Sequence, residues 1–172
     1  MSLNYSVSLL TIRRILMAGI VLCIVGGATT QALAESRQQL LANVWKQYDA
    51  GDDKAVIKNA TACLFEAGDQ ARLVQSRLAA THTPQPLTGA SDRNSKEARA
   101  IFDRGLLNDV GACQVMLAKS YARLHQCADA AQAYRAASAL TYARVWDESQ
   151  SIFWSPAEAA EAWIVGHPGG KC

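Results

Sequence analysis

The chain has 172 residues, of which 50% are hydrophobic and 19% charged, and its formal net charge at pH 7 is +2. This length suits one globular domain and is too short for two of ordinary size. The basic residues form no patch with interleaved aromatic residues, which argues against a nucleic-acid partner.

The first 34 residues have the pattern of an export signal. Arg13 and Arg14 precede an uncharged apolar run over residues 15–25, and small residues close the segment at Ala32 and Ala34. This order is typical of a secretory signal peptide. The run is shorter than the roughly 20 residues that span a bilayer. We predict cleavage near Ala34 and a periplasmic or secreted mature chain. The alternative is an uncleaved signal segment, which would be the only attachment to the membrane.

The chain from residue 35 onward has helical periodicity, because apolar residues recur at steps of three and four. The predicted helices lie near 36–48, 53–68, 69–78, 95–106, 111–124, 128–140 and 156–165. Turn residues set these boundaries: Gly51, Gly68 and Asn108–Asp109 separate helices, and Ser155–Pro156 begins the last one. No alternating apolar pattern predicts a strand. The predicted fold class is therefore all-α.

The longest break between helices is a loop at about residues 82–94, which is rich in proline, glycine and short polar residues. We interpret it as an insertion within one helical domain over residues 35–165. Residues 166–172 form a glycine-rich C-terminal tail.

One segment, residues 111–137, has small and aromatic residues at repeat-like spacing. They are Leu117, Ala118, Tyr121, Ala130, Tyr134 and Ala137. In this the segment resembles a tetratricopeptide repeat (TPR), although Gln114 and Tyr142 depart from the pattern. The resemblance implies antiparallel helical hairpins stacked as a short TPR-like α-solenoid with a C-terminal capping helix. An irregular helical bundle is the alternative.

Four cysteines remain after removal of the signal segment: Cys63, Cys113, Cys127 and Cys172. An even number in an exported chain predicts two disulfides. If the helices alternate in direction, Cys113 and Cys127 lie at opposite ends of a hairpin, about 15 Å apart, and cannot pair. The last helix returns Cys172 towards Cys127. We therefore predict Cys127–Cys172 and, by elimination, Cys63–Cys113.

The sequence contains no pattern of catalytic chemistry. Among the cysteines and histidines, His125 and Cys127 are the only close pair, and no second pair follows at zinc-like spacing. No glycine-rich phosphate loop or nucleophile elbow is present. We expect neither an enzyme nor a cofactor.

The TPR resemblance implies a concave groove that binds extended or helical protein segments. Its positions in the best repeat include Val115, Met116, Lys119 and Arg123. The two basic residues, four apart, are suited to a carboxylate, unless they form only a solvated edge. Large aromatic residues near the C-terminus are interpreted as a cap on the stack or as a contact with a partner. They include Trp146, Trp154 and Trp163.

These features lead to two functional hypotheses. The first is an exported helical-repeat adaptor that binds another envelope protein in envelope assembly or secretion. The second is a small helical periplasmic enzyme or ligand-binding protein with a site near the proline loop and the aromatic tail. A deep pocket holding His82 or His167 beside several carboxylates would favour the second hypothesis. A shallow, continuous groove would favour the first.

Overall fold

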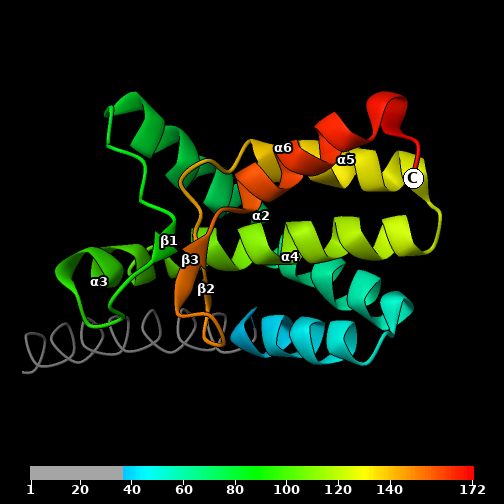
Figure 1. Ribbon diagram of the computed structural model, residues 1–172, viewed down its shortest axis with the longest axis horizontal. Coiled ribbons are helices and arrows are strands. Elements are labelled where there is room, and N and C mark those ends of the chain that lie inside the picture. Colours follow the sequence, from blue (N-terminus) through cyan, green and yellow to red (C-terminus); the bar gives the residue numbers. More distant parts are fainter. Residues whose placement is uncertain (1–36) are drawn as a thin grey trace, which may run out of the picture. The chain divides into compact units, whose positions relative to one another are not determined.

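The computed structural model describes residues 37–172, and the predicted signal peptide with its cleavage site near Ala34 lies outside the described residues. The described part of the chain is mostly helical, as predicted (Figure 1). Residues 37–49 are helical and precede the other elements. These are α2 (Asp53–Ala80), β1 (Gly89–Ala90), α3 (Lys96–Phe102), α4 (Gly105–Arg123), α5 (Cys127–Ser138), β2 (Val145–Asp147), β3 (Ile152–Trp154), α6 (Pro156–Gly166) and the 3₁₀-helix η1 (Pro168–Gly170).

Residues 37–49 and α2 form a first helical hairpin. Gly51 turns the chain with a positive φ of 75°, which glycine adopts without strain. The Asp52 side chain then accepts a hydrogen bond from the Ala55 N–H and caps α2. The predicted helix end at Gly68 is wrong, because α2 continues to Ala80. A glycine within a helix costs only about 1 kcal/mol, and Gly68 is buried on the packed face of α2.

Helices α4 and α5 form a second hairpin, which turns at His125 with a φ of 56°. The predicted helix separation at Asn108–Asp109 is wrong, since both residues lie inside α4. Asn108 is buried, and its side-chain amide donates to the Ile101 carbonyl while its oxygen accepts from the Arg144 N–H. Asparagine was expected to favour a break because it competes for backbone hydrogen bonds. Here its partners are backbone groups of other elements.

Three short strands form an antiparallel sheet in the order β1-β3-β2. The prediction of no strands is therefore wrong. Phe153 in β3 faces Gly89 of β1 and Trp146 of β2 in register. It is buried and packs in a small core cluster with Ala98 and Ile101 of α3. Strands this short carry almost no periodicity, and β1 pairs with β3 more than sixty residues away, so the local pattern could not reveal the sheet.

Helix α6 begins where the sequence predicts. The Ser155 hydroxyl accepts from the Glu158 N–H, and Pro156 occupies the first turn. The start of α6 lies very close to α4, since a Cβ atom on Gly111 would be 2.9 Å from both Ala143 Cβ and Pro156 Cγ. Glycine is thus required at position 111 for this close approach.

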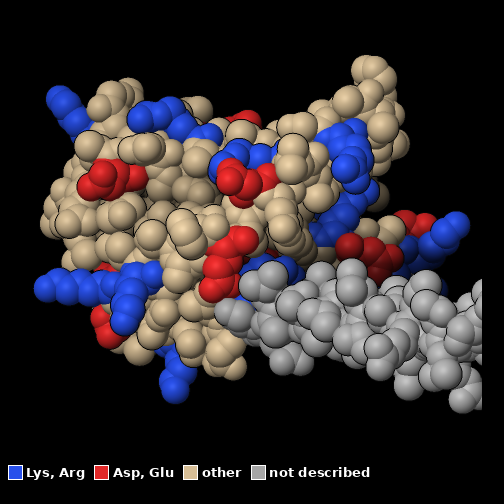
Figure 2. All heavy atoms as spheres, turned by 180° about the vertical axis from the view of Figure 1, so that it is seen from behind, with Lys and Arg blue, Asp and Glu red and all other residues tan. Residues whose placement is uncertain are grey.

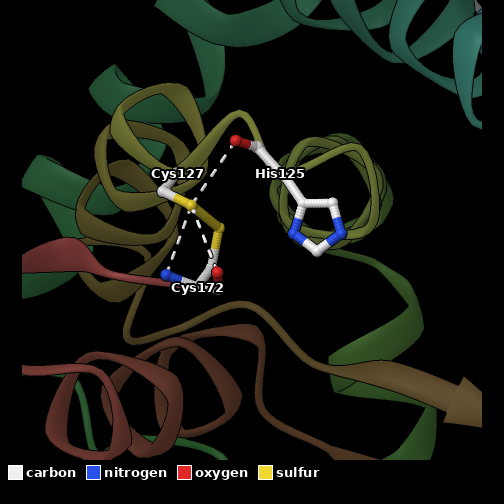
Figure 3. The surroundings of a disulfide bond; sticks show 3 residues. All are labelled: His125, Cys127 and Cys172. Carbon is white, nitrogen blue, oxygen red and sulfur yellow. Dashed lines mark hydrogen bonds between the residues drawn. A yellow bond between two sulfur atoms is a disulfide. The ribbon is translucent and has the colours of Figure 1, made fainter.

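Two disulfides join the predicted pairs. Cys63–Cys113 connects α2 to α4, and both residues are fully buried. Cys127–Cys172 fastens the exposed C-terminus to the start of α5, where the Cys172 N–H also donates to the Cys127 sulfur (Figure 3). The helix order used to predict these pairs was partly wrong, because Cys63 lies within one long helix rather than near the end of a short one. The predicted pairing is nonetheless correct, because α2 packs against α4.

Among the described residues, no helix has the length and apolar character needed to cross a membrane.

Candidate functional site

The predicted binding groove does not lie where the TPR resemblance implied. Val115 and Met116 have exposed fractions of 0% and 2%. They belong to the main core cluster, together with Val44 from the first helical segment and Ala160 from α6. Their assignment to an open groove is wrong, because other helices cover this face of α4.

Lys119 and Arg123 lie near the rim of the same face but already have partners. The Arg123 guanidinium lies 3.9 Å from the centre of the Tyr48 ring, and the Lys119 ammonium 5.7 Å from it. Arg123 also pairs with Asp53 at the start of α2, with Nη2 2.7 Å from Oδ1. Burial lowers the pKa of Lys119, and the positive charge of Arg123 lowers it further. Both cations thus contribute to the contact between the two hairpins.

The residues predicted to pack the α4–α5 hairpin are largely buried. Leu117, Ala118, Ala130, Tyr134 and Ala137 have exposed fractions of 7% or less, and Tyr121 is half-buried. The Gln114 side chain donates to the Ala133 carbonyl across the hairpin, with an N–O distance of 3.2 Å. Gln114, which departs from the repeat pattern, therefore bridges the two helices.

A shallow groove lies along the opposite face of α4, between α2 and α5. It consists of two adjoining hollows of about 320 and 280 Å³ that share Gln114 and Ala136. Its floor is a stripe of α4 residues at spacings of four, three and four: Val110, Gln114, Leu117 and Tyr121. Its walls are Thr61, Leu64, Gly68, Arg72, Gln75 and Ser76 on one side and Asp129, Gln132, Ala133, Ala136, Ala139 and Leu140 on the other. We call this surface the α4 groove.

The α4 groove is long and lined by apolar, small and amide side chains. From Val110 to Tyr121 it follows α4 for about 16 Å at 1.5 Å per residue. Its charged residues are at the two ends, with Arg72 at one and Asp129 at the other. Sequence reasoning missed this surface, although the same four-three-four spacing of its floor is visible in the sequence.

A second hollow of about 430 Å³ lies between the first helical segment and the β2–β3 hairpin. It is lined by Trp45, Asp49, Trp146, Asp147, Glu148, Ser149 and Trp154. We call it the tryptophan cleft. Trp146 and Trp154, predicted as cap or partner aromatics, thus line one cleft, and Trp45 joins them from the other end of the chain.

Trp163 has a different place. Its ring stacks on Tyr134 at 4.3 Å and on His167 at 4.4 Å between ring centres. Burial raises the pKa of Tyr134 to about 12, with a further contribution from Tyr48. Trp163 therefore packs α6 against α5.

The tryptophan cleft is negatively charged. Asp147 accepts hydrogen bonds from the backbone and side chains of Ser149 and Gln150, at 2.6–3.2 Å. These bonds, that of the Ser149 hydroxyl above all, lower the pKa of Asp147 and keep it ionised. Glu148 pairs with Arg93, which is not part of the lining. No lysine or arginine lines the cleft.

The proline loop also borders a hollow, of about 280 Å³, between residues 85–91 and α3. Its ionisable lining residues are Glu97 and Arg104, and neither His82 nor His167 lines it. Within residues 37–172, no group of three or more His, Cys, Asp or Glu side chains could hold a metal ion. This hollow therefore lacks the histidine that the second hypothesis expects beside the proline loop.

The surface carries charges of both signs. Figure 2 shows acidic and basic residues interspersed over one face rather than separated by sign.

Comparisons with protein-family models, curated proteins and solved structures found no match to the chain.

Proposed function

We propose that this protein is an exported adaptor that binds a helical segment of another envelope protein, in envelope assembly or secretion. The observation that carries the proposal is the α4 groove, which is shallow and continuous over three turns of α4. A groove between two helices accepts a third helix, because side chains of the incoming helix fill the space between the flanking ridges.

The lining of the α4 groove favours a helix over an extended strand. Gly68, Ala133 and Ala136 are small enough to allow a close approach, and the exposed Gln132 amide can donate to or accept from polar side chains of the partner. The amides of Gln75 and Gln114 already bond within the chain. An extended partner segment would need unpaired backbone N–H and C=O groups in the groove to bond with its own. A helix pairs most of its backbone groups internally, and the helices that form the groove offer few free ones.

Asp129 at one end of the groove sets a direction for the bound helix, whereas the charge of Arg72 at the other end is offset by its ion pair with Asp69. The N-terminus of a helix carries partial positive charge and its C-terminus partial negative charge. We therefore propose that the partner helix runs from the Asp129 end towards the Arg72 end.

The TPR-like arrangement is part of the proposal. The first helical segment with α2 and then α4 with α5 are successive hairpins, α2 packs against α4, and α6 packs against both α4 and α5. This order suits two stacked repeats and a capping helix. Two disulfides are compatible with a periplasmic or extracellular location.

The test is crosslinking in the native host with a photoreactive amino acid at Ala136, which is exposed in the α4 groove. The control position is Ala128, exposed on the same helix but outside the groove. We expect one envelope protein to be crosslinked from position 136 alone, and Ala136→Arg, but not Ala128→Arg, to abolish its co-purification. Equal results at both positions would contradict the proposal.

A ligand-binding role is the second candidate function. It is favoured by the tryptophan cleft, whose volume lies within the range of about 300–1,000 Å³ typical of small-molecule sites.

A further inference from the structure

We infer that the tryptophan cleft binds a small organic cation, and specifically a quaternary ammonium group. This site is separate from the α4 groove, with which it shares no lining residue. The inference therefore does not depend on the adaptor proposal.

The aromatic lining is the first reason. Trp45, Trp146 and Trp154 border one cleft although they come from distant parts of the chain. The face of an indole ring carries negative charge density and attracts cations more strongly than the other aromatic side chains do. Trp45 and Trp154 are half-buried and pack against the main core, so their positions are fixed by the fold.

The third indole of the cleft, that of Trp146, is also held in place by packing. The Trp146 ring lies 4.8 Å from Phe153 and 6.2 Å from Phe102, in edge-to-face geometry with both. A ring that is ordered before binding loses little entropy when the ligand arrives. The cleft thus provides a preorganised aromatic surface.

The charges in the cleft select the sign of the ligand. Asp49 and Asp147 supply two carboxylates, whereas the charge of Glu148 is offset by Arg93. These carboxylates would repel an anion, and a neutral ligand would gain no attraction from their charge. Charge complementarity therefore favours a cation.

The mixture of indoles and carboxylates further selects the kind of cation. A divalent metal ion requires several oxygen ligands around one point, and no such group of three side chains exists among residues 37–172. A primary ammonium is strongly hydrated and would lose water against the indoles. A quaternary ammonium carries its positive charge on an apolar surface. It can therefore pack against the indole rings and also be attracted by the carboxylates.

The experiment measures binding of choline to the oxidised full chain by calorimetry and tryptophan fluorescence. Its matched control ligand is 3,3-dimethylbutan-1-ol, which has the same shape without the charge, at equal ionic strength. We expect saturable choline binding that is about tenfold tighter than binding of the neutral analogue. The amide of Nα-acetyl-lysine, a primary ammonium, should bind more weakly than choline.

Three substitutions test the assignment of the site. Asp49→Asn, at an exposed position, should weaken choline binding several-fold without changing binding of the neutral analogue. Arg93→Ala should tighten choline binding, since it removes the cation paired with Glu148. Asp103→Asn, an exposed change outside the cleft, should have no effect.

The inference is overturned if choline does not bind saturably, if the neutral analogue binds equally well, or if the primary ammonium binds more tightly. It is also overturned if Asp49→Asn, with unchanged thermal unfolding, leaves choline binding unaltered. Failure of the adaptor proposal has a different signature, because Ala136→Arg should abolish partner binding and leave choline binding intact.

Discussion

Replacing Asn108 by alanine should strongly destabilise the fold, because this buried side chain bridges three segments. The substitution leaves the buried Arg144 N–H without its acceptor, which lies 2.9 Å away. An unsatisfied buried donor costs about 1–3 kcal/mol. The Ile101 carbonyl loses one bond of 2.7 Å but keeps another from the Arg104 N–H at 3.0 Å. This second loss is therefore smaller, about 0.5–1.5 kcal/mol.

Together these losses predict that Asn108→Ala lowers the free energy of unfolding by about 3 kcal/mol. The melting temperature should fall by roughly 10 °C in a domain of this size. Urea unfolding of the oxidised chain measures the change, provided that the dependence on urea concentration keeps its slope. Asn94→Ala, at an exposed position, is the matched control and should change stability by less than about 0.5 kcal/mol. A loss below about 1 kcal/mol for Asn108→Ala would refute the reasoning.

Three further predictions concern close packing, the disulfides and the acidic cleft. Gly111→Ala should destabilise the chain by about 1–3 kcal/mol because its Cβ has no room, whereas Gly105→Ala, with nothing within 4 Å, should be neutral or slightly stabilising in the same unfolding assay. Mild reduction should open the exposed Cys127–Cys172 bond before the buried Cys63–Cys113 bond, since an attacking thiolate must reach the sulfur. Pulsed alkylation followed by mass spectrometry measures the order, and labelling of the buried cysteines first would refute the prediction. In an NMR titration the pKa of Asp147 should lie below its ordinary value of 3.8. Because this pKa is lowered in the folded state, Asp147 stabilises the fold above its ordinary pKa, and this stabilisation is lost as the pH falls through the folded-state pKa. A midpoint at or above 3.8 would contradict this prediction.

Much of the local structure could be predicted because its causes are local. Gly51 at a positive φ, the hydroxyl cap of Ser155 and the proline at position 156 each act within a few residues of chain. The same holds for the apolar periodicity that indicates helices. The disulfide pairs could also be predicted, because excluding one pairing and following the direction of the chain left few choices.

Other features depend on which elements pack together. Gly68 and Asn108 were read as helix breaks, since in isolation these residues disfavour helix. In the fold, Gly68 is buried on the packed face of α2 and Asn108 has backbone partners from other segments, and these contacts outweigh local preference. The pairing of β1 with β3 likewise joins Gly89 to Phe153, which no local pattern encodes.

The amino-acid sequence by itself therefore determined the helical class, the hairpin turns, the start of the last helix and the two disulfides. Tertiary structure alone decided which face of α4 is open, because that depends on where the first helical segment and α6 come to rest. It placed Val115 and Met116 in the core and opened the side that carries Gln114. It also brought Trp45 to Trp146 and Trp154. Helical periodicity identifies the positions that share a face, whereas only packing between distant segments determines which face is covered.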